Sequence, residues 1–576
     1  MTSAQIAQRL NEIAALMEFD GEPFFKIKAY ERAARSLEDS QTPVEVLLES
    51  GELEGLPGIG KAISQKIADI NRTGTCKYLD ELRAKFPPTI LELLSVPGIG
   101  AKTAVSLYRE LSVGGLLDLR RVIDDGSIAR VPRLGPKTIE NIKSQLARVG
   151  TQTRRLRLGN AWPLAREIVD ALAALPFARN VVAAGSLRRM ERSVSDVDII
   201  CTSAQPEKVI KAFVALPIVE RVSAQGTTKA TIWAEPGISV DLRVVAHECF
   251  GNLLQHFTGN KEHNVRLREH ALRKGLKVSE YGIEDKAGKV ATFVDEADVY
   301  AMLGLQFIPP ELRLGLDEIE LAKRNALPVI VELGDIRGDL HDHTNWSDGV
   351  CTIEQMARAA AQRKREYLSI SDHSPGRAVA NGLSVERLQE QIGQVKSVAD
   401  RFGVHLFSSS EVDIRADGSL DLADDVLAQL DIVVASIHSS FRAPKEQQTK
   451  RLLRAIENPY VNIIGHPTGT LIEERAGYEF DVDAVFRAAA RTGTALEINS
   501  NPARLDLSAD LARKAKEMGC IFSVDTDAHY IEDMDNMLFG VATARKAGIT
   551  KERVLNAQPL QDVLAFVRKK RSATRE

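Results

Sequence analysis

The chain is poor in several residue types and patterns, and each scarcity argues against a class of protein. Its five cysteines lie far apart and form no CxxC pair, which argues against a disulfide framework and against a cysteine-ligated zinc site. No apolar run approaches the roughly 20 residues that a membrane span needs. The N-terminus lacks the basic start and apolar core of a signal peptide. We therefore expect a protein of the reducing cytoplasm that has no membrane partner.

The sequence also lacks an excess of basic residues, because its formal net charge is −4. Any DNA binding must then come from local basic clusters. Histidine is unevenly distributed: none precedes His247, and seven of the eleven follow residue 330. Metal chemistry is therefore expected mainly in the C-terminal part. The length of 576 residues predicts about four structural units at roughly 150 residues per domain.

The apolar pattern changes twice along the chain. Residues 1–150 show helical spacing, as in Ile6, Leu10 and Ile13, with Gly-rich turns between the helices. Short β-type runs appear from about residue 160, and a helical stretch and a linker follow them. After Asp335, short apolar strands alternate with helical stretches, and each strand ends in a polar motif. That alternation is typical of a parallel barrel or doubly wound sheet with catalytic groups at the carboxyl ends of its strands.

A weak repeat occurs in the helical part: LPGIGKAISQKI (56–67), VPGIGAKTAVSL (96–107) and VPRLGPKTIENI (131–142). Glycine allows close backbone approach, and the amides that begin the following helix can hold a phosphate oxygen. One copy could equally be an αα turn with a glycine cap, but two good copies favour helix-hairpin-helix clamps on the DNA backbone. The third copy has Arg133 in place of the first glycine. The candidate DNA-binding residues are Gly58, Gly60, Gly98, Gly100 and Lys102.

Three carboxylates carry the chemistry predicted for the middle of the chain. Asp196 and Asp198 project from one side of a strand, and Asp241 can join them from a neighbouring strand. Alone, a DxD pair is more often a solvated strand face. Three clustered carboxylates suit two divalent ions, with oxygen ligands that favour Mg²⁺ or Mn²⁺. Ser186 and Arg189, in the preceding Gly-Ser turn, are placed to hold a triphosphate.

The segment GSLRRMERSVSDVDII resembles the nucleotidyltransferase signature of family X DNA polymerases, which are DNA polymerase beta-like. The segment HFTGNKEHNVRLREHALRKGLKVSEYGI (256–283) resembles the thumb of the same family, so the resemblance covers residues 1 to about 315. It implies that Asp241 is the base that activates the primer 3′-hydroxyl. His256 stands where the family usually has tyrosine, which puts sugar discrimination in doubt. The resemblance places nucleotide contacts at Gly185, Ser186, Arg189, His256, Gly259, Asn264 and Arg268.

The family's N-terminal domain can also remove a 5′-deoxyribose phosphate through a lysine Schiff base. Lys66 occupies the matching position, and Tyr30 matches a family tyrosine. Such a lysine needs a lowered pKa, through burial or through cations such as Lys26 and Lys61. A solvated helix lysine or a phosphate contact is the open alternative for Lys66.

Metal-ligand residue types recur at the strand ends of the C-terminal part. Six histidines and three carboxylates exceed what one ion can use, so two or three ions are expected, with Zn²⁺ or Mn²⁺ suited to such mixed ligands. Such a cluster can activate a bound water and hold a phosphate. The predicted ligands are His341, His343, Asp348, His373, Glu411, His438, His466, Asp527 and His529.

This ligand pattern resembles the polymerase and histidinol phosphatase (PHP) domain over residues 335–576, and all nine ligand positions are occupied. The resemblance implies a distorted barrel of about seven strands, (β/α)7. Bacterial-type family X polymerases carry this domain as a 3′→5′ exonuclease, sometimes also acting at abasic sites. Nearby basic residues are candidates for guiding the DNA end, with scattered surface charge as the alternative: Arg377, Arg442, Lys445, Lys450 and Arg451.

We therefore expect a multidomain α+β and α/β protein, a monomer that binds gapped or primer-template DNA and deoxynucleoside triphosphates. We expect it to add deoxynucleotides to primer 3′ ends at short gaps by a two-metal mechanism. Its PHP domain is expected to hydrolyse DNA phosphoesters as a 3′→5′ exonuclease, an abasic-site endonuclease or a 3′-phosphatase. The alternative is a PHP nuclease or phosphatase whose polymerase half is mainly a DNA-binding module. A repair scaffold without enzymatic activity would require that both metal sites are inactive. The expected domains are a lyase-like helical domain (1–84), a fingers-like helical domain (85–155), a palm with a mixed sheet (156–248), a thumb (249–315), a linker (316–334) and the PHP domain (335–576).

Overall fold

The structure is a computed structural model. It describes residues 3–39, 44, 47–48, 51–87, 89–96, 99–131, 134–135, 138–143, 155–234, 237–398 and 401–572. The chain divides into two units, Met1–Thr153 and Arg154–Glu576. No helix in these described ranges is long and apolar enough to cross a membrane.

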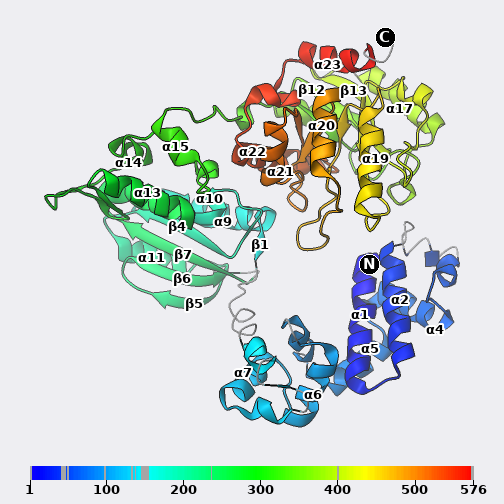
Figure 1. Ribbon diagram of the computed structural model, residues 1–576, viewed down its shortest axis with the longest axis horizontal. Coiled ribbons are helices and arrows are strands. Elements are labelled where there is room, and N and C mark those ends of the chain that lie inside the picture. The colour runs from blue at the N-terminus through cyan, green and yellow to red at the C-terminus, as the bar shows by residue number, and fades with distance from the viewer. Residues whose placement is uncertain are drawn as a thin grey trace. The chain divides into compact units, whose positions relative to one another are not determined.

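The first unit is helical, as its apolar spacing predicts. The side chains of Ile6, Leu10, Ile13 and Met17 recur on one face of the first helix and are buried in a single core. This helix packs along the second one (Figure 1). The helices are α1 (Ser3–Asp20), α2 (Phe24–Asp39), α4 (Lys61–Thr73), α5 (Lys77–Lys85), α6 (Ala101–Leu111) and α7 (Leu116–Asp124).

The second unit begins with a five-stranded mixed sheet in the order β2-β4-β7-β6-β5. Strands β4 and β7 are parallel, and the other pairs are antiparallel. Helices α9 and α11 pack with one face of this sheet. The elements are β1 (Leu156–Arg157), α9 (Leu158–Ala173), β2 (Arg179–Ala183), α10 (Gly185–Arg188), β3 (Ser193–Val194), β4 (Asp196–Thr202), α11 (Pro206–Val214), β5 (Val219–Gln225), β6 (Lys229–Ala234) and β7 (Ile238–Val245).

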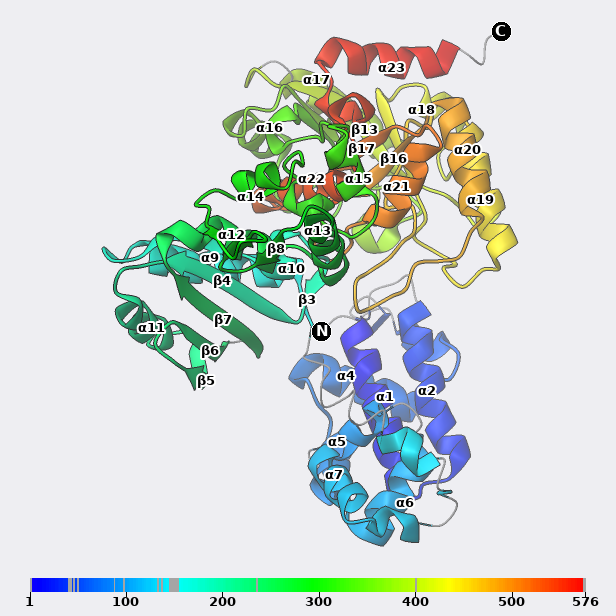
Figure 2. The same ribbon diagram turned by 60° about the vertical axis from the view of Figure 1, so that its left-hand side comes forward.

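A helical segment with a small antiparallel sheet follows, and Figure 2 shows α12 and α13 beside the larger sheet. Phe250, Leu253 and Leu254 of α12 pack on Ile200 of β4, on the sheet face opposite α9. The elements are α12 (Phe250–Thr258), α13 (Lys261–Arg273), β8 (Lys277–Ser279), β9 (Gly282–Glu284), β10 (Val290–Ala291), α14 (Glu296–Met302) and α15 (Glu318–Lys323).

The C-terminal part is a parallel sheet of seven strands in sequence order, β11 to β17, within the described residues. A bridge between Asp342 and Ala528 brings the first and last strands together, so the barrel is nearly closed. The strands are β11 (Gly338–Asp342), β12 (Tyr367–Ile370), β13 (His405–Asp413), β14 (Ile432–Ser436), β15 (Ile463–Ile464), β16 (Ala495–Asn499) and β17 (Phe522–Asp525).

Helices surround this barrel on the outside (Figures 1 and 2). Val563 and Val567 of the last helix pack on Leu340, Tyr367 and other residues near the strand starts, which leaves the carboxyl ends for the site. The helices are α16 (Ile353–Gln362), α17 (Val385–Val398), α18 (Asp424–Leu427), α19 (Lys445–Glu457), α20 (Val482–Thr492), α21 (Ala509–Glu517), α22 (Met537–Lys546) and α23 (Leu560–Ser572). The predicted mixture of helical, mixed-sheet and barrel parts is confirmed.

Candidate active sites

The three predicted aspartates of the mixed sheet lie on one face. Val197, Ile199, Val240 and Leu242 point into the core beneath the sheet, so the alternating residues Asp196, Asp198 and Asp241 face the other way. The parallel register of β4 and β7 sets Asp198 directly opposite Asp241. The sequence predicted this grouping from strand alternation, without the register.

Electrostatic repulsion within this group favours a bound cation. Burial, followed by the charges of Asp196 and Asp241, raises the pKa of Asp198 to about 7. Thr231 on the adjacent strand donates a hydrogen bond to Asp241. Carboxylates that face one another in this way repel unless a cation lies between them. The donor set fits divalent ions of the Mg²⁺ or Mn²⁺ kind, whose preferred ligands are oxygens.

Gly185 starts the short helix α10 directly beside the aspartates. Its φ is +62°, and a Cβ at this position would lie 2.2 Å from Asp198 Oδ2. The amide of Ala184 donates to the carbonyl of Asp198, at 2.8 Å, which fixes the turn against β4. Ser186 is half-buried in the same turn. The guanidinium of Arg189 donates to the carbonyl of Thr258, at 2.8 Å, and so connects this turn to α12.

The predicted base-pair contacts lie where α12 ends and α13 begins. The amide of Asn264 donates to the carbonyls of His256, at 2.8 Å, and Gly259, at 3.1 Å, while its oxygen accepts from Gln255. Arg268 donates to the carbonyl of Asn264 at 3.2 Å. Burial lowers the pKa of His256. These four predicted residues therefore lie in one local network.

The first hairpin is described in the helical unit, and the second one only in part. Helix α4 begins directly after Gly58-Ile59-Gly60, with Ile59 buried, and α6 begins directly after Gly100. Gly98 lies outside the described residues, and the Lys102 side chain is not described.

Lys66 lies on α4 next to Tyr78, which in turn stacks on Tyr30. Its Nζ donates to the carbonyl of Ala62, at 3.1 Å, and lies 5.5 Å from the centre of the Tyr78 ring. Tyr30 stacks on Tyr78 at 6.2 Å. Lys26, expected to supply a cation, forms an ion pair with Glu22 at 2.9 Å. The predicted lysine and tyrosine are therefore close neighbours of Tyr78, which sequence reasoning did not single out.

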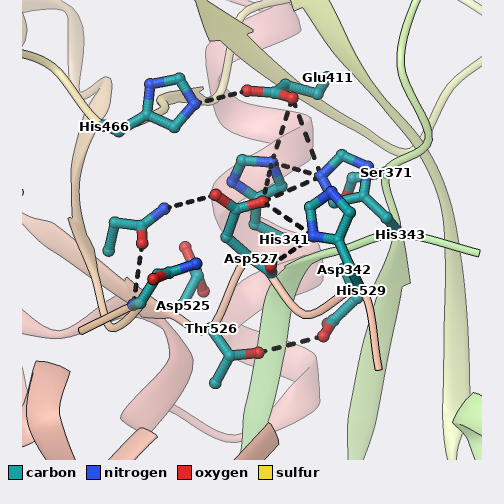
Figure 3. A network of polar contacts seen from close by, with 12 residues as sticks. His341, Asp342, His343, Ser371, Glu411, His466, Asp525, Thr526, Asp527 and His529 are labelled. Atoms are coloured by element: carbon teal, nitrogen blue, oxygen red, sulfur yellow. Dashed lines mark hydrogen bonds and ion pairs between the residues drawn. The ribbon is translucent and has the colours of Figure 1, made fainter. Parts of the chain in front are cut away.

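In the barrel, the predicted ligands come from the strand ends and the loops that follow them. His341 lies in β11 and Glu411 in β13, and the others lie in the loops after β11, β12, β14, β15 and β17. Figure 3 shows Glu411, His341, His343, Asp527 and His529 converging. Three groups have ligand atoms close enough to hold an ion: His343, Asp348, His373 and His529; His341, His343 and Asp527; and His373, Glu411 and His438.

Short distances connect these groups into one cluster. His341 Nε2 and His343 Nε2 lie 3.2 Å apart, and His343 Nε2 lies 3.1 Å from Asp527 Oδ1. His466, the predicted ligand outside the three groups, has its Nε2 2.8 Å from Glu411 Oε1. Glu411 is buried, and the adjacent histidines His438, His373 and His341 hold its pKa well below the ordinary value.

Two carboxylates that sequence reasoning missed orient the ligand histidines. Glu497 accepts a hydrogen bond from His341 Nδ1 at 2.6 Å, and Asp413 accepts one from His438 Nδ1 at 2.6 Å. Such bonds fix the imidazole so that Nε2 faces a metal. The signal was present, because Asp413 follows Glu411 by two residues on β13 and Glu497 lies in the strand-end motif ALEINSN.

The buried donors and the backbone both fit a metal centre. His343 Nδ1 is buried without a hydrogen-bond partner among the described residues, and a metal would satisfy a buried lone pair of this kind. His466 and Asp527 have positive φ angles, 27° and 53°. Non-glycine residues rarely adopt such angles, which tend to occur at functional sites. Mixed imidazole and carboxylate donors suit Zn²⁺ or Mn²⁺.

The basic residues expected to guide DNA differ in exposure. Arg442, Lys445 and Lys450 are exposed. Arg451 is buried, and its guanidinium donates to the carbonyls of Ile414, Arg415 and Ser439. The expectation that Arg451 contacts DNA is therefore wrong, because its side chain holds loops of the barrel together.

Comparisons with known proteins match segments of both units. Family models match residues 1–76 (helix-hairpin-helix domain), 90–148 (SAM-like helix-hairpin-helix tandem), 253–314 (DNA polymerase beta thumb) and 339–501 (PHP domain). The chain is 34% identical over 230 residues to a probable phosphatase of Thermoanaerobacter sp. (strain X514), which covers 38% of this chain and 89% of that protein. It is also 31% identical over 245 residues to a probable phosphatase of Caldanaerobacter subterraneus subsp. tengcongensis. That match covers 40% of this chain and 91% of the phosphatase.

A longer match spans both active sites. The chain is 40% identical over 573 residues to the DNA polymerase/3′-5′ exonuclease PolX of Bacillus subtilis, which covers 99% of this chain and 100% of that protein. The predicted resemblance to bacterial-type family X polymerases with a PHP domain is thereby confirmed. The chain belongs to the PolX family of DNA polymerases/3′-5′ exonucleases.

Proposed function

We propose that the chain adds deoxynucleotides to primer 3′ ends at short gaps in DNA and that its PHP domain hydrolyses phosphodiesters at 3′ ends. Membership of the PolX family supports both activities. The single observation that carries the polymerase proposal is the register that sets Asp198 opposite Asp241. The converging ligands of the barrel carry the nuclease proposal.

In the polymerase site, Asp196, Asp198 and Asp241 would hold two Mg²⁺ or Mn²⁺ ions, which supply charge stabilisation for in-line phosphoryl displacement. Asp241 accepts the proton of the primer 3′-hydroxyl. Ser186 and Arg189 orient the triphosphate. Thr231 keeps Asp241 in place through its hydrogen bond.

The contacts at the nascent base pair come from α12 and α13. Gly259, Asn264 and Arg268 lie there together with His256. Burial lowers the pKa of His256, so the neutral imidazole is favoured at the sugar face. The hairpin residues Gly58, Gly60, Gly98, Gly100 and Lys102 bind the DNA backbone.

In the barrel, the nine ligands would hold two or three Zn²⁺ or Mn²⁺ ions, which supply an activated water and a clamp for the phosphate. Glu497 and Asp413 hold His341 and His438 in the orientation for coordination. Most of these ligands are buried, whereas the side chains of Asp348 and His529 are partly exposed. A phosphatase whose polymerase half only binds DNA is the second candidate, and the matches to probable phosphatases favour it.

One gapped-duplex assay separates these candidates. The protein is incubated with a labelled primer in Mg²⁺ or Mn²⁺, with and without deoxynucleoside triphosphates. We expect primer extension with nucleotides and stepwise shortening without them. A parallel primer that ends in a 3′-phosphate tests the phosphatase. Release of that phosphate, with neither extension nor shortening of the hydroxyl-ended primer, would instead support the second candidate.

We also propose a lyase activity of the first unit, from Lys66 next to Tyr78, on which Tyr30 stacks. Borohydride should trap a covalent adduct between the protein and abasic DNA through a Schiff base at the amine of Lys66. Lys66→Ala should abolish the adduct, whereas Lys77→Ala, an exposed lysine at the start of α5, should retain it. An adduct that persists in Lys66→Ala would show that another residue is the nucleophile.

A further inference from the structure

Three arginines lie near one another at the carboxyl end of the barrel. Arg377 follows His373 after β12, Arg475 follows His466 after β15, and Arg504 lies in the loop after β16. Burial, followed by the charges of Arg504 and Arg377, lowers the pKa of Arg475 to about 10. Three loops from different strands therefore bring three positive charges together at the end that carries the predicted ligands.

Arg504 connects this group to the candidate metal centre. Its Nε lies 3.5 Å from Asp527 Oδ2. The group therefore borders the place where the scissile phosphate would be held.

Arg475 is held rigidly in its loop. Its Nε donates to the carbonyl of Gly469 at 2.9 Å, and its guanidinium lies 3.8 Å from the centre of the Phe441 ring. Phe441 in turn stacks on Tyr478. A guanidinium fixed by stacking and one bond keeps its other donors in a defined plane, which suits bidentate binding of phosphate.

The arginines of this group form one direct ion pair with a carboxylate among the described residues, and the charges of Asp506 and Glu474 act on Arg475 from further away. Arg504 has one carboxylate partner, which is itself a predicted metal ligand. Neither Arg377 nor Arg475 forms an ion pair with a described carboxylate, and Arg377 Nε is buried without a hydrogen-bond partner there. Like charges that are held together in a partly buried place favour the binding of an anion between them.

We propose that Arg377, Arg475 and Arg504 form a clamp for the phosphate next to the scissile one on the DNA strand that the PHP site degrades. The inference rests on the proposed exonuclease function. The metal ions held by the predicted ligands would bind the scissile phosphate. Because one phosphodiester carries a single negative charge, three further cations are more than its neutralisation requires. The clamp makes the site prefer a polynucleotide over a phosphoester that carries one phosphorus.

The test compares a 3′-labelled oligonucleotide with bis(p-nitrophenyl) phosphate, which has one phosphorus atom. Losing a charged bond to the neighbouring phosphate should lower the ratio of kcat/KM for the oligonucleotide over the small diester about tenfold or more in Arg475→Ala. Arg377→Ala is the second variant, because no hydrogen bond of its Nε supports the loop. A ratio that stays at the wild-type value in both variants would overturn the clamp.

Binding supplies a second readout that does not depend on turnover. Full-length protein in EDTA is titrated with a fluorescent single-stranded oligonucleotide at several salt concentrations. Each lost phosphate contact should reduce the slope of log K against log salt by about 0.7. Arg491→Ala, an exposed arginine at the end of α20 that pairs with Glu457, is the matched control and should keep the slope.

The two readouts distinguish failure of the clamp from failure of the proposed function. If wild type shortens the oligonucleotide and both arginine variants keep the slope and the ratio, only the clamp is wrong. If wild type does not hydrolyse the oligonucleotide in any metal, the exonuclease function is wrong, and an unchanged slope in the variants would remove the clamp as well.

Discussion

At the scale of single residues, Gly185 determines whether Asp198 can lie beside the other two aspartates. A Cβ at residue 185 would overlap the carboxylate of Asp198, and the φ of +62° adds a backbone cost for any other residue. The glycine of the Gly-Ser turn was assigned to nucleotide binding on resemblance. Its contact with a predicted metal ligand could not be inferred from the sequence, because it depends on how α10 approaches β4.

Gly185→Ala should therefore impair polymerisation. The added methyl group displaces Asp198, and a shift of about 1 Å in a catalytic group can cost roughly 100-fold in rate. Primer extension on a gapped duplex measures the loss. Gly237→Ala is the control, because Gly237 also has a positive φ, +87°, but no atom lies within 4 Å of its Cβ position. Equal extension rates for the two variants would show that the contact with Asp198 does not matter.

Protonation of the barrel ligands gives a second prediction. In the metal-free protein the pKa of His373 is raised to about 10 and that of His529 to about 9, against burial, by the adjacent carboxylates Glu411, Asp348 and Asp527. Both imidazoles are therefore protonated at pH 7.5. A metal needs the neutral ring, so its binding must release protons.

His373 and His529 belong to one candidate ion group, so filling it should release about two protons at pH 7.5. Its apparent affinity should rise with pH until the pH passes the pKa values of about 9 and 10. Calorimetric titration in buffers of different ionisation enthalpy counts the protons. Heats that do not vary with the buffer would contradict the prediction.

At the scale of elements, strand alternation predicted much of both sites. The motifs at the strand ends indicated where the nine barrel ligands lie, because the carboxyl ends of parallel strands meet at one end of the barrel. The orienting carboxylates Glu497 and Asp413 were missed, because a second carboxylate near a ligand does not reveal which histidine it contacts. Arg451 was misplaced because an arginine on an amphipathic helix is usually exposed.

Arg451 gives a prediction about stability at this scale. Its guanidinium donates to three backbone carbonyls, and Arg451→Ala leaves these buried acceptors unpaired. We expect the free energy of unfolding to fall by about 3 kcal/mol. Lys450→Ala, at the adjacent exposed residue of α19, should change it little. Urea titration followed by circular dichroism measures both variants, and equal midpoints would contradict the structural role of Arg451.

At the scale of the whole chain, the palm-like sheet and the barrel share contacts within the second unit. Lys546 of α22 forms an ion pair with Glu191 at 2.9 Å, and Leu505 and Phe539 belong to the same hydrophobic cluster as Val197 of β4. The sequence predicted a linker between these parts, and it holds α15. The packing of the sheet against the barrel could not be predicted. A single lysine such as Lys546 is usually exposed, and nothing in the sequence indicates its partner more than 300 residues away.

The ligand sets of the two sites remain separate despite this packing. The first set uses oxygen ligands from β4 and β7, and the second is rich in histidine and comes from the barrel. Different ligand sets imply different ions. Nucleotide addition and phosphodiester hydrolysis should therefore be lost independently.

The most direct measurement is a paired assay on one 3′-labelled gapped duplex. His341→Ala with His343→Ala should abolish shortening of the primer and keep nucleotide addition, because none of the aspartate ligands is touched. Asp196→Ala with Asp198→Ala should abolish addition and keep shortening. Metal content is measured in both variants. Full nuclease activity in the histidine variant, or loss of both activities in either folded variant, would contradict two independent active sites.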